Sequence, residues 1–316
     1  MAFGVGNQKT AERVVHGAAS PVAGAIAALA ANLSIETSPK EALRGVDGLR
    51  DLPADTRVFI TRLPTGSFED TLAAAVKLRE RGFSPVPHVT ARTTPDAATL
   101  AYRLKRLIEE GGVREILLVA GSNDRPEGVF DNTLDILSSG VIEGSGLVAL
   151  NVAGHPEGHP NADEATLRRA LDAKNEFAVR TGLPVTLVTQ FFFDAAPVIA
   201  WEKTIRAQGN LLPIDPGLHG VTGVPSLLKH ALACGVGASV KALGSHSGGL
   251  IQFVQMRSPE GLIHDLAMAK IADPGSLFRN AHFFPLGGFF RTVKFCNALR
   301  EGRFSLSETE GLSVPS

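Results

Sequence analysis

One stretch of the chain, residues 185–194, restricts the possible folds more than any other. It reads VTLVTQFFFD, an apolar run of β-branched and aromatic residues broken only by Thr186, Thr189 and Gln190. A strand that is buried on both faces has this composition, and such strands occur in parallel sheets covered by helices. The amide of Gln190 needs hydrogen-bond partners in so apolar a setting, either on a neighbouring strand or on a polar ligand. In a parallel barrel the carboxyl ends of the strands face the active site, and Gln190 and Asp194 lie toward that end, so the stretch is a candidate floor of a ligand pocket.

Strand-like runs alternate with helix-like segments along the whole chain, which is typical of a parallel sheet with crossover helices. The expected strands are 32–37, 57–63, 85–90, 115–120, 146–152, 185–194, 211–214 and 282–286. The expected helices include 68–81, 95–107, 163–180, 224–234 and 263–272. This order predicts an α/β fold of the (β/α)₈ TIM barrel type, which we prefer to an open doubly wound sheet.

The barrel is expected to occupy residues 31–300 as one domain, since 316 residues can bury a core of that size. Residues 1–30 are expected to form an N-terminal extension with a barrel-capping helix at 21–31, and a cleaved signal peptide is the less favoured alternative. Residues 301–316 are expected to form a frayed C-terminal tail. The segment GSHSGG at 244–249 is either a phosphate-binding loop or, more commonly for such a composition, a flexible loop.

Composition excludes several classes of protein. Apolar residues make up 44% of the chain, charged residues 20%, and the net charge is -1, so we expect a soluble protein that binds neither nucleic acid nor membrane. Cys234 and Cys296 lie in no CxxC or Cys/His cluster, so no disulfide framework or zinc site is expected and a reducing, cytoplasmic location fits. No GxGxxG or GxxxxGK[ST] motif follows a strand, so neither a classical dinucleotide fold nor a P-loop is predicted.

Polar residues stand at the carboxyl ends of successive expected strands, and a barrel would bring them to one pocket. They are Glu36, Thr61, His88, Asn123, Asp124, His155, Glu157, His159 and Gln190. Glu36 is the strongest candidate for acid–base chemistry, because desolvation at the end of a hydrophobic strand would raise its pKa toward neutrality. The alternative for Glu36 is a structural ion pair with Lys40 or a barrel arginine.

The other candidates are weaker when each is taken alone. A histidine such as His88 is more often a satisfied core or turn residue than a catalyst. His155, Glu157 and His159 could be metal ligands, but Pro156 and Pro160 exclude the helix that would align them, and we predict no metal site. Lys174 by itself is typical of a solvated surface lysine.

Several of these motifs, in this order, resemble the methylenetetrahydrofolate reductases, which are flavin-dependent (β/α)₈ barrels. The resemblance extends from about Leu33 to Leu286. Residues 34–40 (SIETSPK) are similar to the family's first-strand motif, residues 154–160 (GHPEGHP) to its Tyr-Pro-Glu-x-His-Pro segment, and residues 189–194 (TQFFFD) to its TQ-F-F-D motif.

The resemblance implies roles for individual residues. Glu36 would be the general acid that protonates N10 as the folate imidazolidine ring opens, and Gln190 would contact the pterin. The residues expected at the folate or nicotinamide are Gln190, Phe191, Phe193, Leu218 and Asn123. The residues expected at FAD are Thr61, His88, Gly121, Ser122, Asp124, His155, Glu157, His159 and Lys174.

Some positions depart from the family pattern. The family's fourth strand usually ends in a glycine followed by an aspartate placed near the flavin and pterin, whereas here Ser122 and Asn123 follow Gly121 and Asp124 is displaced. Loss of an anion beside the isoalloxazine would favour the reduced flavin, because a nearby negative charge opposes added charge in a site of low dielectric. This gives the hypothesis that the enzyme oxidises 5-methyltetrahydrofolate in one-carbon catabolism.

Other departures concern the cofactor and the electron donor. His155 replaces a flavin-stacking tyrosine, Lys174 aligns only approximately with the family's lysine, and Leu218 lies closest to a phenylalanine that sandwiches nicotinamide or folate. We expect an FAD-dependent oxidoreductase, a cytoplasmic homo-oligomer, that interconverts 5,10-methylenetetrahydrofolate and 5-methyltetrahydrofolate with NAD(P)H. A flavin-independent reductase, a non-redox folate-binding or lyase barrel and an inactive regulatory subunit remain open alternatives, as does the choice between NADH and NADPH.

Overall fold

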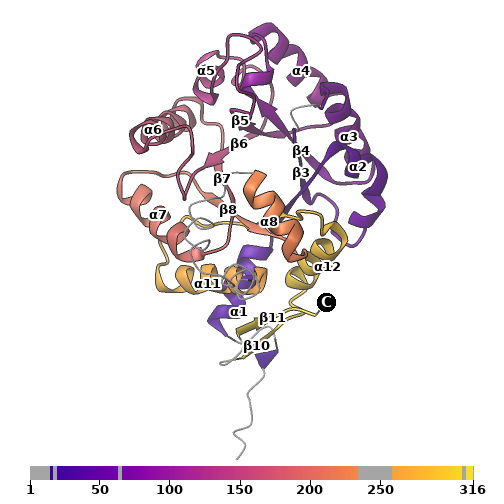
Figure 1. Ribbon diagram of the computed structural model, residues 1–316, viewed down its shortest axis with the longest axis vertical. Helices are drawn as coiled ribbons and strands as arrows, with labels where there is room; N and C mark the ends of the chain where they lie inside the picture. The colour runs from indigo at the N-terminus through magenta and orange to yellow at the C-terminus, as the bar shows by residue number, and fades with distance from the viewer. Residues whose placement is uncertain (1–14, 17–19, 63–65, 234–257, 308–310, 316) are drawn as a thin grey trace, which may run out of the picture.

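The computed structural model describes residues 15–16, 20–62, 66–233, 258–307 and 311–315. Parallel strands close into a barrel in the order β2-β3-β4-β5-β6-β7-β8-β9, and helices surround it (Figure 1). The predicted (β/α)₈ barrel is therefore confirmed. The 244–249 segment, proposed above as a loop, lies outside the described residues.

Most of the expected elements are present with small shifts at their ends. The barrel strands are β2 (Ser34–Thr37), β3 (Arg57–Ile60), β4 (Ser84–Thr90), β5 (Glu115–Val119), β6 (Ala149–Gly154), β7 (Val185–Phe192), β8 (Ile214–His219) and β9 (His282–Phe284). The helices are α1 (Pro21–Ala30), α2 (Pro39–Gly45), α3 (Phe68–Glu80), α4 (Ala97–Glu109), α5 (Thr133–Ser138), α6 (Glu164–Thr181), α7 (Ala195–Ala207), α8 (Val224–Ala233), α11 (Pro259–Ala272) and α12 (Phe289–Arg300), with short 3₁₀ turns η1 (Val46–Leu49) and η2 (Ala91–Thr93).

Local sequence explains where several helices begin and end. Ser67 and Asp70 form a reciprocal capping box at the start of α3, which satisfies two backbone N–H groups of its first turn. At the start of α6 the Asp163 side chain accepts a single hydrogen bond from the Thr166 N–H, and Gly182, with φ of 69°, ends that helix.

The seventh barrel strand was predicted incorrectly. We expected residues 211–214, but β8 begins at Ile214 and runs to His219 through Pro216 and Gly217, two residues that usually interrupt strands. Gly217 is required there because a Cβ would lie 2.4 Å from the carbonyl oxygen of Thr189 on the neighbouring strand. The close approach of β7 and β8 therefore requires glycine at this position of β8, although proline and glycine usually interrupt strands.

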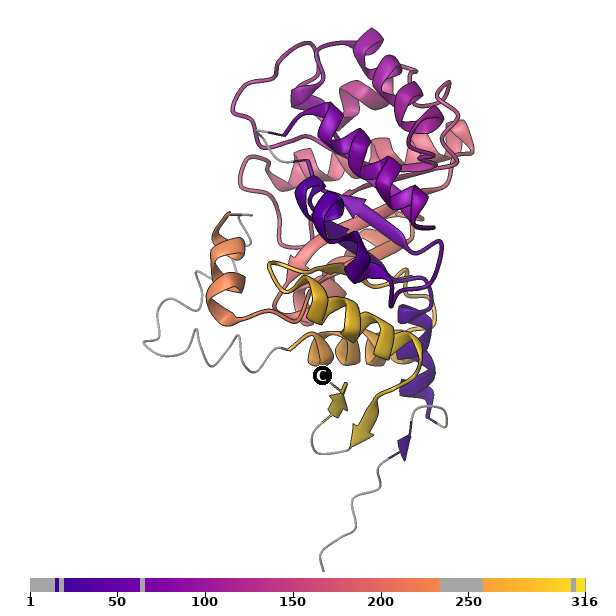
Figure 2. The same cartoon turned by 90° about the vertical axis from the view of Figure 1, so that its right-hand side faces the viewer.

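The C-terminal residues are not the frayed tail that we expected. β10 (Ser305–Ser307) and β11 (Gly311–Ser313) join β1 (Val15–His16) in a separate antiparallel sheet of order β1-β10-β11. Leu312 is buried in this sheet. α1 packs beside α11 and α12, at the end of the molecule that carries the small sheet (Figures 1 and 2).

The barrel has an apolar interior with a polar layer at its amino end. Side chains alternate along each strand, so that Phe59, Val86 and Val188 meet inside the barrel while their neighbours face the helices. Below them Asp215, which is 0% exposed, accepts hydrogen bonds from Arg57 at 2.7 Å and Arg279 at 3.2 Å. Since this layer closes the amino end, a ligand reaches the interior from the carboxyl ends of the strands.

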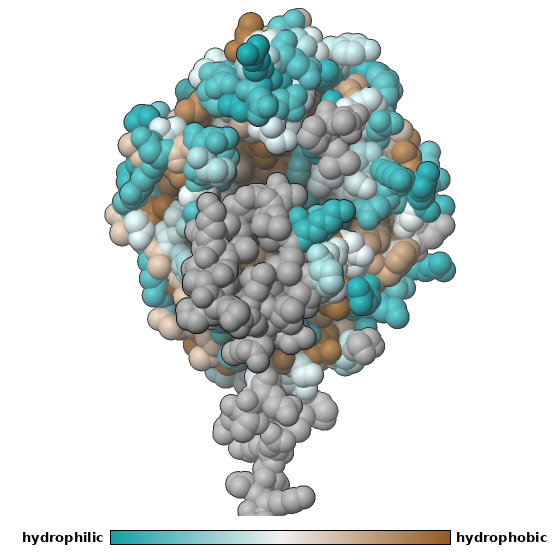
Figure 3. All heavy atoms as spheres, viewed as in Figure 1, coloured by the Kyte–Doolittle hydropathy of each residue, from teal (hydrophilic) through white to brown (hydrophobic). Residues whose placement is uncertain are grey.

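The carboxyl ends of the strands face the viewer in Figure 1. α8 follows β8 directly and lies in front of the barrel in that view, and Figure 2 shows it standing away from the ring of helices. In the space-filling view apolar residues reach the surface near the centre of this face, while polar residues predominate over the outer helices (Figure 3). No helix in the described part of the chain is long and apolar enough to cross a membrane.

Candidate active site

Glu36 is the centre of the candidate site. It lies on β2 between Ile35 and Thr37 and points into the barrel, where it is 8% exposed. Its Oε1 atom is 3.1 Å from Nε2 of His88 and 3.4 Å from Nε2 of His282. Neither Lys40 nor an arginine is its partner, so the expected ion-pair alternative is wrong; β4 and β9 instead supply two imidazoles.

The direction of the Glu36 pKa shift is opposite to the one that we expected. Burial by itself would raise the pKa of this carboxyl group, as the sequence argument assumed. The charge of His88 at 3.1 Å and the hydrogen bond from His282 outweigh burial and hold the pKa of Glu36 at about 2. Glu36 is therefore a carboxylate in this arrangement at neutral pH.

His282 was not among the predicted site residues. It is 0% exposed, and its ring stands edge-on to Phe59 and Phe284 with centroids 4.5 and 4.7 Å away. Its Nδ1 atom lies 2.8 Å from the hydroxyl oxygen of Ser34, which is also 0% exposed. The signal that could have revealed His282 is a lone histidine opening an apolar strand, but its partner Glu36 is 246 positions away in sequence.

Gln190 is exposed, not buried as the apolar run suggested. A β-bulge explains the difference: Val188 pairs with Asp215 and Phe191 pairs with Gly217, so two residues of β7 face one residue of β8. The amide oxygen of Gln190 accepts from the N–H of Phe191 at 3.3 Å. Its NH₂ group has no hydrogen-bond partner in the described part of the chain and is available to a ligand.

Aromatic rings line the site beside Gln190. Phe191 is within 5.9 Å of Phe193 and 5.6 Å of Phe284, measured between ring centroids. His219, at the end of β8, lies 5.7 Å from Phe193. These rings form an apolar wall of the kind that a flat heterocycle can pack against.

Leu218 does not belong to this wall. It is 0% exposed and packs in the core between the barrel and its helices. Its neighbour His219 occupies the inward-facing position, because side chains alternate along β8. The expectation that Leu218 faces the site was therefore wrong by one residue: the side chain of His219 faces it instead.

The end of β5 carries the departure from the family's aspartate. Gly121 has φ of 96°, and a Cβ there would meet Thr90 at 3.3 Å. Ser122 and Asp124 are exposed, and Asn123 is partly buried. The carbonyl of Asn123 accepts a hydrogen bond from Nη1 of Arg92 at 3.0 Å. Nη2 of the same guanidinium lies 3.2 Å from Oδ1 of Asp131, so the cation next to this loop already has an ion-pair partner.

The end of β6 brings the second group of predicted residues together. His155 and His159 have ring centroids 5.2 Å apart, and His159 is exposed while His155 is partly buried. Burial, with the charges of Lys174 and His159, lowers the pKa of His155 to about 3. Glu157 lies between them in the loop. No cluster of three metal-ligating side chains occurs among the residues that the structure describes.

Lys174 is buried rather than a solvated surface residue. Its ammonium donates to the carbonyl of Ala153 at 2.8 Å, and burial lowers its pKa to about 8. One N–H bond is used in this way, which leaves two for a ligand. Thr61, at the end of β3, donates its hydroxyl to the carbonyl of Thr37 at 3.3 Å.

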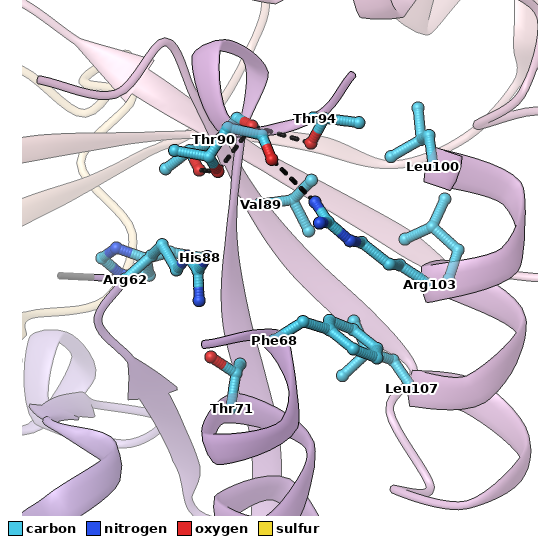
Figure 4. Close-up of a pocket in the computed structure, with 12 residues that line it drawn as sticks. Arg62, Phe68, Thr71, His88, Val89, Thr90, Thr94, Leu100, Arg103 and Leu107 are labelled. Carbon is cyan, nitrogen blue, oxygen red and sulfur yellow. Dashed lines mark hydrogen bonds between the residues drawn. The ribbon is translucent and has the colours of Figure 1, made fainter. Parts of the chain in front are cut away.

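A pocket beside His88 contains an unpaired guanidinium (Figure 4). Nη1 of Arg62 is buried without a hydrogen-bond partner among the described residues. Burial and the nearby charge of Arg103 lower the pKa of Arg62. Arg103 itself donates to the carbonyl of Thr93 at 2.8 Å. Two guanidinium groups without an ion-pair partner in the described ranges make this pocket suited to an anion.

Comparison with known proteins agrees with the motifs. The model of the methylenetetrahydrofolate reductase family matches residues 55–241. Methylenetetrahydrofolate reductase 2 of Saccharomyces cerevisiae is 27% identical over 169 residues, which cover 48% of this chain and 26% of the yeast protein. The 5,10-methylenetetrahydrofolate reductase of Pectobacterium carotovorum is 25% identical over 243 residues, which cover 74% of this chain and 76% of that protein.

A similar solved structure is an uncharacterised protein from Clostridium thermocellum that binds two copies of 5-methyl-5,6,7,8-tetrahydrofolic acid. The TM-score is 0.59, the sequence identity is 8%, and the match covers 88% of this chain and 97% of that one. At this identity the likeness concerns the fold alone.

Proposed function

This chain belongs to the methylenetetrahydrofolate reductase family, and we propose that it interconverts 5,10-methylenetetrahydrofolate and 5-methyltetrahydrofolate, with FAD as cofactor and NAD(P)H as the second substrate. The observation that carries the proposal is the buried Glu36 carboxylate at the carboxyl end of the barrel. It lies at the same end of the barrel as the NH₂ group of Gln190, unbonded within the described ranges, and the aromatic wall. A polar acid–base group, an orienting amide and an apolar surface are what a pterin requires.

We assign to Glu36 the transfer of a proton to or from N10 of the folate. In the reductive direction the bond between the methylene carbon and N10 breaks, N10 takes a proton, and the carbon takes a hydride. FAD, when bound, supplies the hydride carrier. Glu36, a carboxylate at neutral pH, removes this proton from N10 in the oxidative direction; in the reductive direction it first takes up a proton from solvent and then gives it to N10. Gln190 orients the pterin by its amide, and Phe191 and Phe193 exclude water from the reacting carbon.

The residues present fit a cofactor that carries phosphates. The buried, unpaired Nη1 of Arg62 and the two remaining N–H bonds of Lys174 are donors that an anion can satisfy. We assign the cofactor contacts to Arg62 together with the residues expected from sequence, namely Thr61, His88, Gly121, Ser122, Asp124, His155, Glu157, His159 and Lys174. His155 presents a neutral ring in place of a stacking phenol.

We also propose that the reaction runs toward oxidation of 5-methyltetrahydrofolate. The neutral Asn123 stands near the place where the family carries an anion, and the nearby guanidinium of Arg92 is paired with Asp131 at 3.2 Å. Loss of that anion favours an electron-rich, reduced flavin. Asn123→Asp should therefore lower the flavin potential, as measured by equilibration with redox dyes. An unchanged or higher potential in that variant would refute the proposed direction.

The first test of function is the visible absorption of the purified protein, followed by anaerobic addition of 5-methyltetrahydrofolate. Bleaching of a flavin spectrum by this folate supports both the activity and the oxidative direction. Bleaching by NAD(P)H alone supports the activity and reverses the direction. If no flavin binds after incubation with FAD, the cofactor assignment fails and direct hydride transfer between NAD(P)H and folate replaces it.

A further inference from the structure

The β-bulge in β7 decides which side chains of this strand face the site. Val188 packs inside the barrel with Phe59. Regular alternation from Val188 would turn Phe192 into the barrel and Phe191 toward the helices. Instead Phe192 packs in the core between the barrel and its helices, and Phe191 lies in the aromatic wall with its ring centroid 5.9 Å from that of Phe193. The extra residue of the bulge therefore reverses the direction of every side chain that follows it.

The hydroxyl group of Thr189 lies within this bulge and is bonded on both sides. Gly217 on β8 donates its N–H to Oγ1 of Thr189 at 2.8 Å, and Oγ1 donates in turn to the carbonyl of Gln190 at 2.9 Å. Thr189 is 1% exposed, and backbone groups buried to this degree need hydrogen-bond partners. One side chain thus supplies an acceptor and a donor to the backbone at the point where the register of β7 and β8 changes.

The strands on both sides of β7 leave room for this arrangement. Thr189 pairs with Gly154 on β6, and a Cβ on Gly154 would lie 3.5 Å from the methyl carbon of Thr189. A Cβ on Gly217 would lie 2.4 Å from the carbonyl oxygen of Thr189. Thr189 is therefore held between two glycines, with its methyl group toward β6 and its hydroxyl group bonded to β8.

We propose that Thr189 is a positioning residue for the ligand that Gln190 and the aromatic wall receive. Its hydroxyl group stabilises the bulge, which keeps Gln190 exposed at the end of the barrel and turns Phe191 and Phe193 toward the site. Oε1 of Gln190 accepts from the N–H of Phe191 at 3.3 Å, so its NH₂ group is the part directed to an acceptor atom of a heterocycle. The identity of that heterocycle as a reduced pterin rests on the proposed function, whereas the role of Thr189 in the bulge does not.

The role in the bulge is tested by hydrogen exchange at the amide of Gly217, in protein without FAD or folate. Gly217 and Gly275 are the two glycines that follow a proline, so carbonyl-¹³C proline combined with ¹⁵N glycine gives two NMR signals, which a Gly275→Ala variant assigns. We expect the Gly217 amide to be protected in the wild type and in Thr189→Ser. In Thr189→Val, which loses the hydroxyl group, it should exchange at least about ten-fold faster.

Two results of the exchange experiment would overturn the proposal. One is equal protection of Gly217 in Thr189→Val and the wild type. The other is a wild-type Gly217 amide that exchanges as fast as the amide of the exposed Gly275, and this result needs no variant to fold.

The consequence for the ligand is tested by anaerobic calorimetric titration with 5-methyltetrahydrofolate. The bound FAD is first reduced with dithionite, so that it cannot accept a hydride during the titration. Thr189→Val should bind this folate about ten-fold more weakly, the equivalent of one well-placed hydrogen bond, with the affinity for FAD unchanged. Thr189→Ser should restore the affinity for folate, because it keeps the hydroxyl group.

The two ligands separate a positioning role from a structural one. Equal weakening of folate and FAD binding in Thr189→Val, or weakening of neither, would overturn the assignment. A wild type that binds FAD but no folate refutes the proposed function, and the exchange of Gly217 then still decides the role of Thr189 in the bulge.

Thr186→Val is the matched control. It removes another buried hydroxyl group of β7, which accepts a hydrogen bond from Arg279 at the amino end of the barrel. This variant should leave both the exchange of Gly217 and the affinity for folate unchanged. The same changes in Thr186→Val as in Thr189→Val would mean that loss of any buried hydroxyl group of this strand produces them, which contradicts a specific role for Thr189.

Discussion

Replacement of His88 by glutamine should raise the pKa of Glu36. A fall from 4.5 to about 2 in the folded protein corresponds to about 3 kcal/mol of preference for the charged carboxylate, and Glu36 is too buried for solvent to screen much of it. Burial opposes this fall, and His88 makes the largest single contribution in its favour. Without His88, burial is opposed by His282 alone, so the pKa of Glu36 should rise by at least about 1.

The assay is ¹³C NMR of glutamate-labelled protein without cofactor, with the Glu36 carboxyl assigned from a Glu36→Gln variant. Because the pKa of Glu36 is lowered in the folded state, its contribution to the free energy of unfolding is complete above pH 4.5 and is lost as the pH falls from 4.5 through 2. In His88→Gln this loss should be smaller. The matched control is His264→Gln on α11, which should leave the Glu36 titration unchanged. A Glu36 carboxyl that still titrates near 2 in His88→Gln would refute the reasoning, because His282 alone would then outweigh burial.

Three further predictions concern the anion pocket, the polar layer and the β5 turn. Arg62→Ala should weaken FAD binding about ten-fold, because a buried unpaired guanidinium is lost, while Lys105→Ala on the exposed face of α4 should not; fluorescence titration with FAD measures both. Asp215→Asn should lower the free energy of unfolding by about 3–5 kcal/mol, because it leaves two arginines without their buried carboxylate. A midpoint of thermal unfolding within roughly 1–2 °C of wild type would contradict this. Gly121→Ala should lower the free energy of unfolding by about 1–2 kcal/mol, because φ is 96° and the added Cβ meets Thr90. The same thermal unfolding assay measures this change.

The helices and most barrel strands follow from local sequence. The apolar run at 185–192 and the shorter runs before it are long enough and sufficiently β-branched to be strands in any context, and capping residues such as Ser67 and Asp163 mark helix starts. β8 could not be found in this way, because Pro216 and Gly217 are weak strand formers. Their place in the barrel depends on how closely β7 approaches.

The candidate site was only partly predictable for the same reason. Glu36, His88 and Gln190 stand at strand ends, and the closure of the barrel alone implies that they meet. The exposure of Gln190 depends on a bulge that arises between two strands, and the inward direction of His219 rather than Leu218 depends on the start of β8.

The sequence by itself determined the class of fold, the family and the strand that carries the acid, because these depend on residues that are neighbours along the chain. Only the tertiary structure decided the charge state of that acid. Burial, which a strand pattern predicts, raises the pKa of Glu36, whereas His88 and His282 lower it and come from strands 52 and 246 positions away. Electrostatic interactions depend on distance in space, and closure of the barrel brings these groups within 3.4 Å.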